Sequence, residues 1–307
     1  MKIPAIEIQG LKKSFDKVKA LNGVDLDIQQ GEFLGLLGPN GAGKTTTINI
    51  LTGLVIREEG ITKIFGKDTV KDYRFTRSKI GIAAQELSID WFFPLEKLLM
   101  FHAGYYGLPP RVAKKRVDKI INKLGLSDKR NTRLRQLSGG MKRRYQLAKA
   151  LVHDPEIIIL DEPTAGVDVE LRHELWDYLR KLHVEGKTIL LTTHYIEEAE
   201  LLCERVAIIN KGKIIKDGAP KDLTKQLGKS GLTVHLTGWD DKKNHILDNF
   251  SFIYDKGRLH FSILDPEKDM STIIKILSDN DCHIQNISAD KSSLEDVFLD
   301  LTGEKIN

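Results

Sequence analysis

Three glycines and a lysine lie in one loop that joins an apolar run to a helical pattern. The apolar run FLGLL (residues 33–37) is short and continuous, as is typical of a strand buried in a parallel sheet. TTINILTGL (residues 46–54) follows as a helix that ends near Gly53. The loop between them matches G-x-x-x-x-G-K-[ST], and its glycines permit a backbone whose N–H groups surround one anion. This order of elements predicts a phosphate-binding loop at the edge of an α/β sheet.

Two side chains of the loop are expected to contact a nucleoside triphosphate and its metal ion. Lys44 lies where it can reach the β- and γ-phosphates, and Thr45 offers a hydroxyl to Mg²⁺. The following helix adds the positive end of its dipole. A glycine-rich turn with an incidental lysine is the alternative, and the flanking strand and helix make it the weaker interpretation.

Two acidic residues, Asp161 and Glu162, follow a second apolar run, IIIL (residues 157–160). Open α/β sheets bind their ligands at the carboxyl ends of the strands. Because adjacent residues of a strand point to opposite faces, we expect Asp161 to face Mg²⁺ and Glu162 to face the attacking water, as general base or water-positioning group. An acidic turn after a core strand is the alternative, which the phosphate loop disfavours.

Three weaker signals complete the candidate site. Ser138 and the two glycines after it precede a helical pattern, so they form either a second anion site or a simple N-cap. His194 follows the apolar run TILLTT (residues 188–193) and would donate a hydrogen bond to the γ-phosphate, although a lone histidine is more often structural. Gln85 lies where the sheet pattern gives way to helices, and its amide would join the Mg²⁺ or water shell.

The remaining pattern predicts an α/β core and a small second domain. We expect a nucleotide-binding domain at residues 1–220, with an antiparallel β-subdomain and a helical insertion at about 86–155, and a small α+β domain at 221–307. The charge pattern agrees with this division. Residues 230–307 hold 8 Lys and Arg against 14 Asp and Glu, so the net charge of +4 is +10 before residue 230 and −6 from there on.

Several features of the sequence restrict the cellular compartment in which the protein works. Cys203 and Cys282 do not form a disulfide framework, which makes a reducing cytosol the default. No apolar run approaches the ~18 residues of a membrane span, so a membrane role would require another chain. The basic runs at 114–116 and 142–144 are interpreted as solvated helix faces, with proximity to anionic lipid or nucleic acid as the alternative.

Five motifs occur in a fixed order: GPNGAGKTT, AAQE, LSGGM, IIILDEPTAGVD and LTTH. Together they resemble the nucleotide-binding subunit of ATP-binding cassette (ABC) transporters over roughly residues 6–218. AGYYGL, LSGGMKRR, DEPTAGVD, THYIEEAE and SLEDVF extend the resemblance to bacterial ABC-2-type export ATPases of the YadG-like group across nearly the whole chain.

This resemblance implies a P-loop ABC ATPase fold, ATP and Mg²⁺ as ligands, and two ATP molecules held between two copies of the chain in a head-to-tail homodimer. Residues 137–141 would be the signature that contacts the γ-phosphate bound by the other copy. The residues that it implies around the nucleotide are Phe15, Gly38, Pro39, Asn40, Gly41, Ala42, Gly43, Lys44, Thr45, Thr46, Ser138, Gly139, Gly140 and Asp168. Those implied in catalysis are Glu162, His194, Lys44 and Gln85, and those implied at the metal are Thr45, Gln85 and Asp161.

The resemblance also implies an integral membrane ABC-2-type permease as partner, at the cytoplasmic face of the membrane, with Gln85 linking it to the Mg²⁺ site. Three departures leave every catalytic group in place: Met141 replaces a common Gln, Phe15 a usual adenine-stacking Tyr, and residues 165–168 read AGVD. Phe15 is expected either to stack on adenine or to lie in a β-subdomain core.

The same residues also bear on alternatives to a transporter ATPase. A soluble cassette ATPase that acts on ribosomes or DNA is the alternative, but one P-loop and a short insertion disfavour it, so no nucleic acid partner is expected. A binding module with an inactive site is opposed by the intact Lys44, Glu162 and His194. Import remains an alternative to export.

Overall fold

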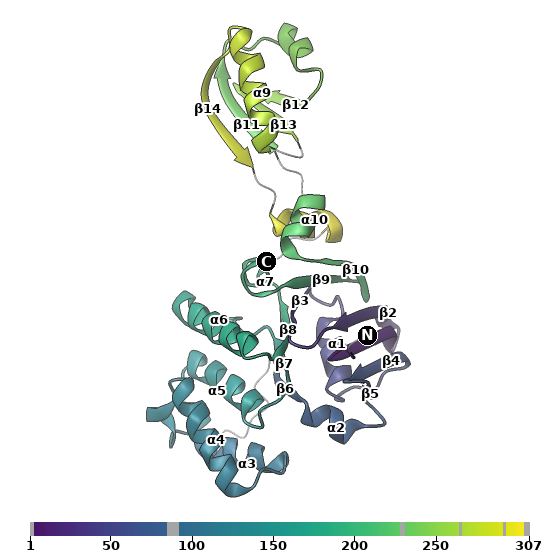
Figure 1. Ribbon diagram of the computed structural model, residues 1–307, viewed down its shortest axis with the longest axis vertical. Helices are drawn as coiled ribbons and strands as arrows, with labels where there is room; N and C mark the ends of the chain where they lie inside the picture. Colours follow the sequence, from purple (N-terminus) through teal and green to yellow (C-terminus); the bar gives the residue numbers. More distant parts are fainter. Residues whose placement is uncertain (1–2, 85–91, 228–230, 264–265, 291–292, 304–307) are drawn as a thin grey trace. The chain divides into compact units, whose positions relative to one another are not determined.

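The computed structural model describes residues 3–84, 92–227, 231–263, 266–290 and 293–303 (Figure 1). The chain divides into two compact units between Ala219 and Pro220, and each is described by itself. Within these ranges, no helix has both the length and the apolar character needed to cross a membrane.

A six-stranded sheet forms the centre of the first unit, with the order β10-β9-β3-β8-β7-β6. The strands are β10 (Lys213–Gly218), β9 (Arg205–Asn210), β3 (Phe33–Leu37), β8 (Thr188–Thr193), β7 (Ile157–Asp161) and β6 (Ile80–Ala83). All are parallel except β10, which pairs antiparallel with β9. Every residue of β3, β7 and β8 is buried, which agrees with the apolar stretches FLGLL, IIIL and ILL within these strands.

An antiparallel sheet of order β2-β1-β4-β5 packs beside this centre and shares one apolar core with it. Its strands are β1 (Ile6–Phe15), β2 (Val18–Ile28), β4 (Glu59–Ile64) and β5 (Lys67–Asp68). Ile6 and Ile8 are buried and alternate with more exposed residues, as the sequence predicts.

Helices complete the first unit: α1 (Lys44–Leu51), α2 (Tyr73–Ser78), α3 (Leu95–Tyr105), α4 (Pro110–Lys123), α5 (Gly139–Leu151), α6 (Val169–Val184) and α7 (Ile196–Leu202). Two short 3₁₀ turns, Ser127–Lys129 and Leu134–Gln136, lie between α4 and α5. Figure 1 shows α3, α4 and α5 gathered on the side of β6 and β7, with β1, β2, β4 and β5 on the other side of the central sheet. The predicted α/β fold class, with its antiparallel β-subdomain and helical insertion, is confirmed.

The second unit is a small α+β fold. Its antiparallel sheet has the order β12-β13-β11-β14. The elements are α8 (Pro220–Leu227), β11 (Gly231–Thr237), a 3₁₀ segment (Asp241–Leu247), β12 (Ser251–Asp255), β13 (Arg258–Ser262), α9 (Pro266–Asp279), β14 (His283–Asp290) and α10 (Leu294–Thr302). Its separate core includes Leu232, Phe261 and Ile273.

Candidate functional site

The loop between β3 and α1 is a tight cradle that requires glycine at two positions. A Cβ on Gly38 would lie 2.4 Å from the backbone oxygen of Ile209, and a Cβ on Gly43 would lie 2.7 Å from Cδ2 of Leu21. Gly43 also has φ +112°, in the region that other residues rarely adopt. The loop therefore fits closely against its neighbours and presents bare backbone to an anion.

Lys44, the first residue of α1, is buried at the centre of this cradle. Its Nζ donates hydrogen bonds to the carbonyl oxygens of Gly38 at 2.6 Å and Pro39 at 3.1 Å. Burial lowers the pKa of the Lys44 ammonium, while the nearby Glu162 and Asp161 carboxylates act in the opposite direction. The cradle therefore contains a fixed cation close enough to the Glu162 and Asp161 carboxylates to interact with them electrostatically.

Asp161 is the last residue of β7, and both of its carboxylate oxygens accept from hydroxyls. Thr192 Oγ1 donates to Oδ1 at 2.5 Å, and Thr45 Oγ1 donates to Oδ2 at 3.4 Å. Burial raises the pKa of Asp161 and so does Glu162, against the hydroxyl hydrogen bonds and Lys44. Hydroxyl and carboxylate oxygens from two adjacent elements are the donor set that a hard cation such as Mg²⁺ prefers, so these residues fit the ion.

Glu162 does not continue the strand, which corrects the expectation from strand alternation. Its φ is +49°, in the left-handed region, and its N–H donates to the carbonyl of Thr192 at 2.9 Å. This backbone turn, rather than the strand pleat, separates the two carboxylates. Glu162 Oε1 lies 3.3 Å from Nδ1 of His194, so the structure brings these two predicted residues together. A residue other than glycine in such a conformation costs about 1–3 kcal/mol and requires support from its surroundings.

The signature residues lie at the start of α5 rather than in the buried site. Ser138 is the N-cap, and its Oγ accepts from the N–H of Met141 at 3.3 Å. Ser138 and Gly139 are exposed, whereas Lys44, Asp161 and Glu162 are buried. Asp168 is likewise an N-cap, of α6, and its Oδ1 accepts from the N–H of Leu171 at 2.9 Å. Ser138 therefore caps α5, a contact that does not exclude an anion site at the same exposed helix end.

Of two other predicted residues, Phe15 is described by the structure and Gln85 is not. Phe15 lies at the end of β1 with 46% of its surface exposed and with Lys13 Nζ 5.3 Å from its ring centre. The alternative that Phe15 is a core residue is therefore wrong. Gln85 lies outside the described residues, which stop at Ala84 before that gap.

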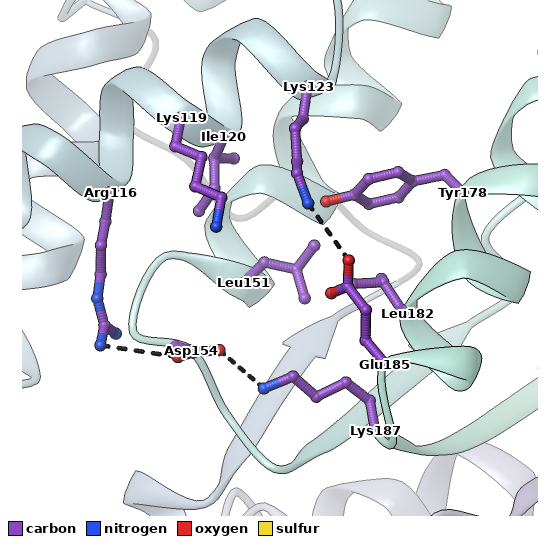
Figure 2. Close-up of a pocket in the computed structure, with 10 residues that line it drawn as sticks. All are labelled: Arg116, Lys119, Ile120, Lys123, Leu151, Asp154, Tyr178, Leu182, Glu185 and Lys187. Carbon is purple, nitrogen blue, oxygen red and sulfur yellow. Dashed lines mark hydrogen bonds and ion pairs between the residues drawn. The ribbon is translucent and has the colours of Figure 1, made fainter.

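A separate cavity of about 130 Å³ lies near the amino ends of β7 and β8, whereas the candidate nucleotide site lies at the carboxyl ends of the strands (Figure 2). It is lined by Arg116, Lys119, Ile120, Lys123, Leu151, Asp154, Tyr178, Leu182, Glu185 and Lys187. Asp154 and Lys187 precede β7 and β8, whereas the phosphate loop follows β3. Asp154 pairs with Lys187 at 2.7 Å and with Arg116 at 3.7 Å, so its charge is already balanced. This cavity is therefore distinct from the candidate nucleotide site.

Sequence reasoning missed three polar residues next to the site. Thr192 lies within the TTH stretch and fixes Asp161. Arg143 donates to the carbonyl of Glu162, and Gln146 accepts from Arg143. The interpretation of residues 142–144 as a solvated helix face is wrong for Arg143, because this side chain points into the molecule. No sequence signal separates it from its basic neighbours.

Comparisons with known proteins agree with this geometry. A family model described as "ABC transporter" matches residues 21–165. Nod factor export ATP-binding protein I of Burkholderia pseudomallei (strain 1710b) is 41% identical over 223 residues, 73% of each chain. Linearmycin resistance ATP-binding protein LnrL of Bacillus subtilis (strain 168) is 31% identical over 98% of this chain and 99% of its own.

A solved structure also resembles this chain. It is a dimeric ATP-binding cassette in a post-hydrolysis state, bound to ADP and Pi. It is 27% identical with a TM-score of 0.65, and the match covers 70% of this chain and 98% of that one.

Proposed function

Because this chain belongs to the ATP-binding subunits of the ABC transporter family, we propose that it hydrolyses ATP to drive a separate membrane permease in export. The observation that carries the ATPase assignment is the buried Lys44 in its glycine cradle, facing Asp161 and Glu162. Phosphoryl transfer needs mainly positioning and charge stabilisation, and these residues supply both.

Each residue has a proposed part in hydrolysis. Lys44 and the loop N–H groups hold the β- and γ-phosphates, and Thr45 and Asp161 hold Mg²⁺. Mg²⁺ bound there would neutralise phosphate charge in the transition state. Glu162 orients the attacking water and accepts its proton, and His194, 3.3 Å from that carboxylate, donates toward the γ-phosphate.

The second wall of each site is proposed to come from another copy of the chain. The exposed N-terminus of α5 provides N–H groups that the buried site of its own chain does not use. A head-to-tail dimer places this helix end on the nucleotide held by the partner's loop, with two-fold symmetry. The similar cassette bound to ADP and Pi is dimeric, which supports the pairing of two copies. ATP then joins two chains, and hydrolysis releases them.

The permease and the direction of transport are proposed from the relatives. One relative is named for export of Nod factor and another for linearmycin resistance, so similar ATPases serve different cargoes. We assign residues 1–220 to the nucleotide-binding domain, acting at the cytoplasmic face, and 221–307 to an extension. The permease docks near Gln85 and the helical insertion. Affinity purification from detergent-solubilised membranes tests this: a polytopic membrane protein should co-purify, and recovery with ribosomes or DNA alone would contradict the transport role.

We predict that Phe15 stacks on adenine. The side chain is exposed at a strand end, and stacking of a base on an aromatic ring is worth about 1–3 kcal/mol. Phe15→Ala should weaken ATP binding by this amount in isothermal titration calorimetry, with an unchanged unfolding temperature. Val18→Ala is the matched control, because Val18 pairs with Phe15 across the hairpin and is also exposed. Equal weakening in both variants, or in neither, would contradict the stacking.

A further inference from the structure

We propose that Arg143 is a positioning residue for Glu162, and that Gln146 joins this pair to the strand end before Gln85. This inference rests on the proposed ATPase function. It gives a role to Arg143, which the sequence does not distinguish from the basic residues on either side. Arg143 and Gln146 both lie on α5, the helix that begins with the signature.

The guanidinium of Arg143 clamps the turn that holds Glu162. Nη2 donates to the carbonyl oxygen of Glu162 at 2.6 Å and lies 3.5 Å from the carbonyl oxygen of Ala165. The N–H of Ala165 also donates to the Glu162 carbonyl, at 3.2 Å. One charged group therefore contacts the backbone at both ends of this turn, and a charged donor makes the stronger class of hydrogen bond.

Arg143 contacts a residue whose backbone is strained. Glu162 has φ +49°, and its peptide groups are held from both directions: its N–H by the carbonyl of Thr192, and its carbonyl by Arg143. The direction of the side chain toward His194 follows from that backbone. Loss of Arg143 removes the charged donor to this strained peptide, so the backbone can relax toward an ordinary conformation and turn the carboxylate away from the water it must orient.

Gln146 extends the contact to Ala84, the residue that follows β6. Arg143 Nη1 donates to Gln146 Oε1 at 2.9 Å, and Gln146 Nε2 donates to the carbonyl of Ala84 at 2.8 Å. The chemistry fixes the orientation of this buried amide, because a guanidinium can only donate and a carbonyl can only accept. The two side chains are three positions apart and therefore share a face of the helix.

The three contacts connect elements that the proposed cycle moves. The first residues of α5 are proposed to meet the partner's nucleotide, and Ala84 immediately precedes Gln85. A shift of α5 on closure of the dimer would reach the Glu162 backbone through Arg143 and the β6 end through Gln146. Lysine can replace Arg143 only in part, because its single ammonium lacks the planar fork that serves Glu162 and Gln146 together.

The test separates positioning from folding. Arg143→Met should lower kcat about ten- to a hundred-fold, the rate equivalent of one charged hydrogen bond that no longer holds the Glu162 backbone in place, with KM for ATP within about two-fold. Arg143→Lys keeps the charge, and we expect it to recover only part of that loss. Arg144→Met is the matched control: Arg144 is the next residue of α5, also partly buried, and it contacts Glu174 and the carbonyl of Leu124. Arg144→Met should lower the unfolding temperature without lowering kcat.

Two changes at Gln146 test the link. Gln146→Glu keeps an acceptor for Arg143 but places an oxygen against the carbonyl of Ala84, whereas Gln146→Leu removes both contacts. We expect kcat to fall more in Gln146→Leu than in Gln146→Glu. We also expect Arg143→Met combined with Gln146→Leu to be no slower than Arg143→Met alone, because the pair acts as a unit.

The outcomes are distinguishable. Parental kcat in Arg143→Met and Arg143→Lys, or equal losses in Arg143→Met and Arg144→Met, would overturn the positioning role while leaving the ATPase assignment intact. Additive losses in the double variant would overturn the link through Gln146. A parental protein that binds ATP but does not hydrolyse it would overturn the proposed function, and this inference with it.

Discussion

Glu162→Gln should bind ATP like the parental protein and hydrolyse it about 10²- to 10⁴-fold more slowly, the usual contribution of general acid–base catalysis. The amide keeps the size and polarity of the side chain but cannot accept the proton of the attacking water. The loss should therefore appear in kcat rather than in ATP affinity, measured by steady-state phosphate release and by equilibrium binding of ATP.

A control for this prediction lies nearby on the chain. Glu197→Gln makes the same chemical change at an exposed position on α7, shortly after His194. This variant should keep the parental rate. Hydrolysis at the parental rate by Glu162→Gln would show that the carboxylate at position 162 does not orient the water, and an equal loss in both variants would show that the effect is not specific to this carboxylate.

Ser138→Arg should abolish both hydrolysis and ATP-dependent dimerisation while each chain still binds ATP. Ser138 is exposed at the N-terminus of α5, so a long cationic side chain would occupy the space proposed for the partner's nucleotide. The nucleotide held by Lys44 within one chain is not touched by this change. Size-exclusion chromatography with MgATP measures the dimer, and equilibrium dialysis measures the bound ATP.

The Ser138→Arg experiment must separate the loss of the helix cap from the loss of the dimer interface. The Ser138 hydroxyl caps α5, and its loss costs about 0.5–2 kcal/mol of stability. Ser138→Ala removes the cap equally but adds no bulk, so the two variants should show similar unfolding temperatures. Loss of the dimer in Ser138→Arg with retention in Ser138→Ala supports the interface. Retention in both would contradict the placement of this helix end on a partner's nucleotide.

Much of the fold could be predicted because buried parallel strands have a distinct sequence. β3, β7 and β8 each contain a run of apolar residues, and each run leads into a motif at the same edge of the sheet. β6 (IGIA) and β5 (KD) have four and two residues, which is too short to show a period. β12 (SFIYD) lacks a buried alternation because it is an edge strand, with Ile253 72% exposed.

The site was predictable as a set of residues but not in its detailed geometry. Asp161 ends β7, and Lys44 and His194 follow β3 and β8 at the same edge of the sheet, so the sheet pattern brings the three residues together. The left-handed backbone at Glu162 depends on contacts with Thr192 and Arg143, which are distant in sequence. From the sequence, a run of three basic residues on a helix is expected to face solvent. Only the rotation of α5 about its own axis turns Arg143 inward, to the carbonyl of Glu162 after β7.

The most direct test of the shared-site account is the mass of Glu162→Gln in solution, measured by multi-angle light scattering with and without MgATP. The chain has a mass of 34.7 kDa. Without nucleotide the variant should be a monomer at this mass. With MgATP its mass should double, because slow hydrolysis preserves the ATP that joins the two copies, and adding Ser138→Arg should return it to 34.7 kDa. A variant that binds ATP stoichiometrically yet remains at the monomer mass would contradict a site built from two chains.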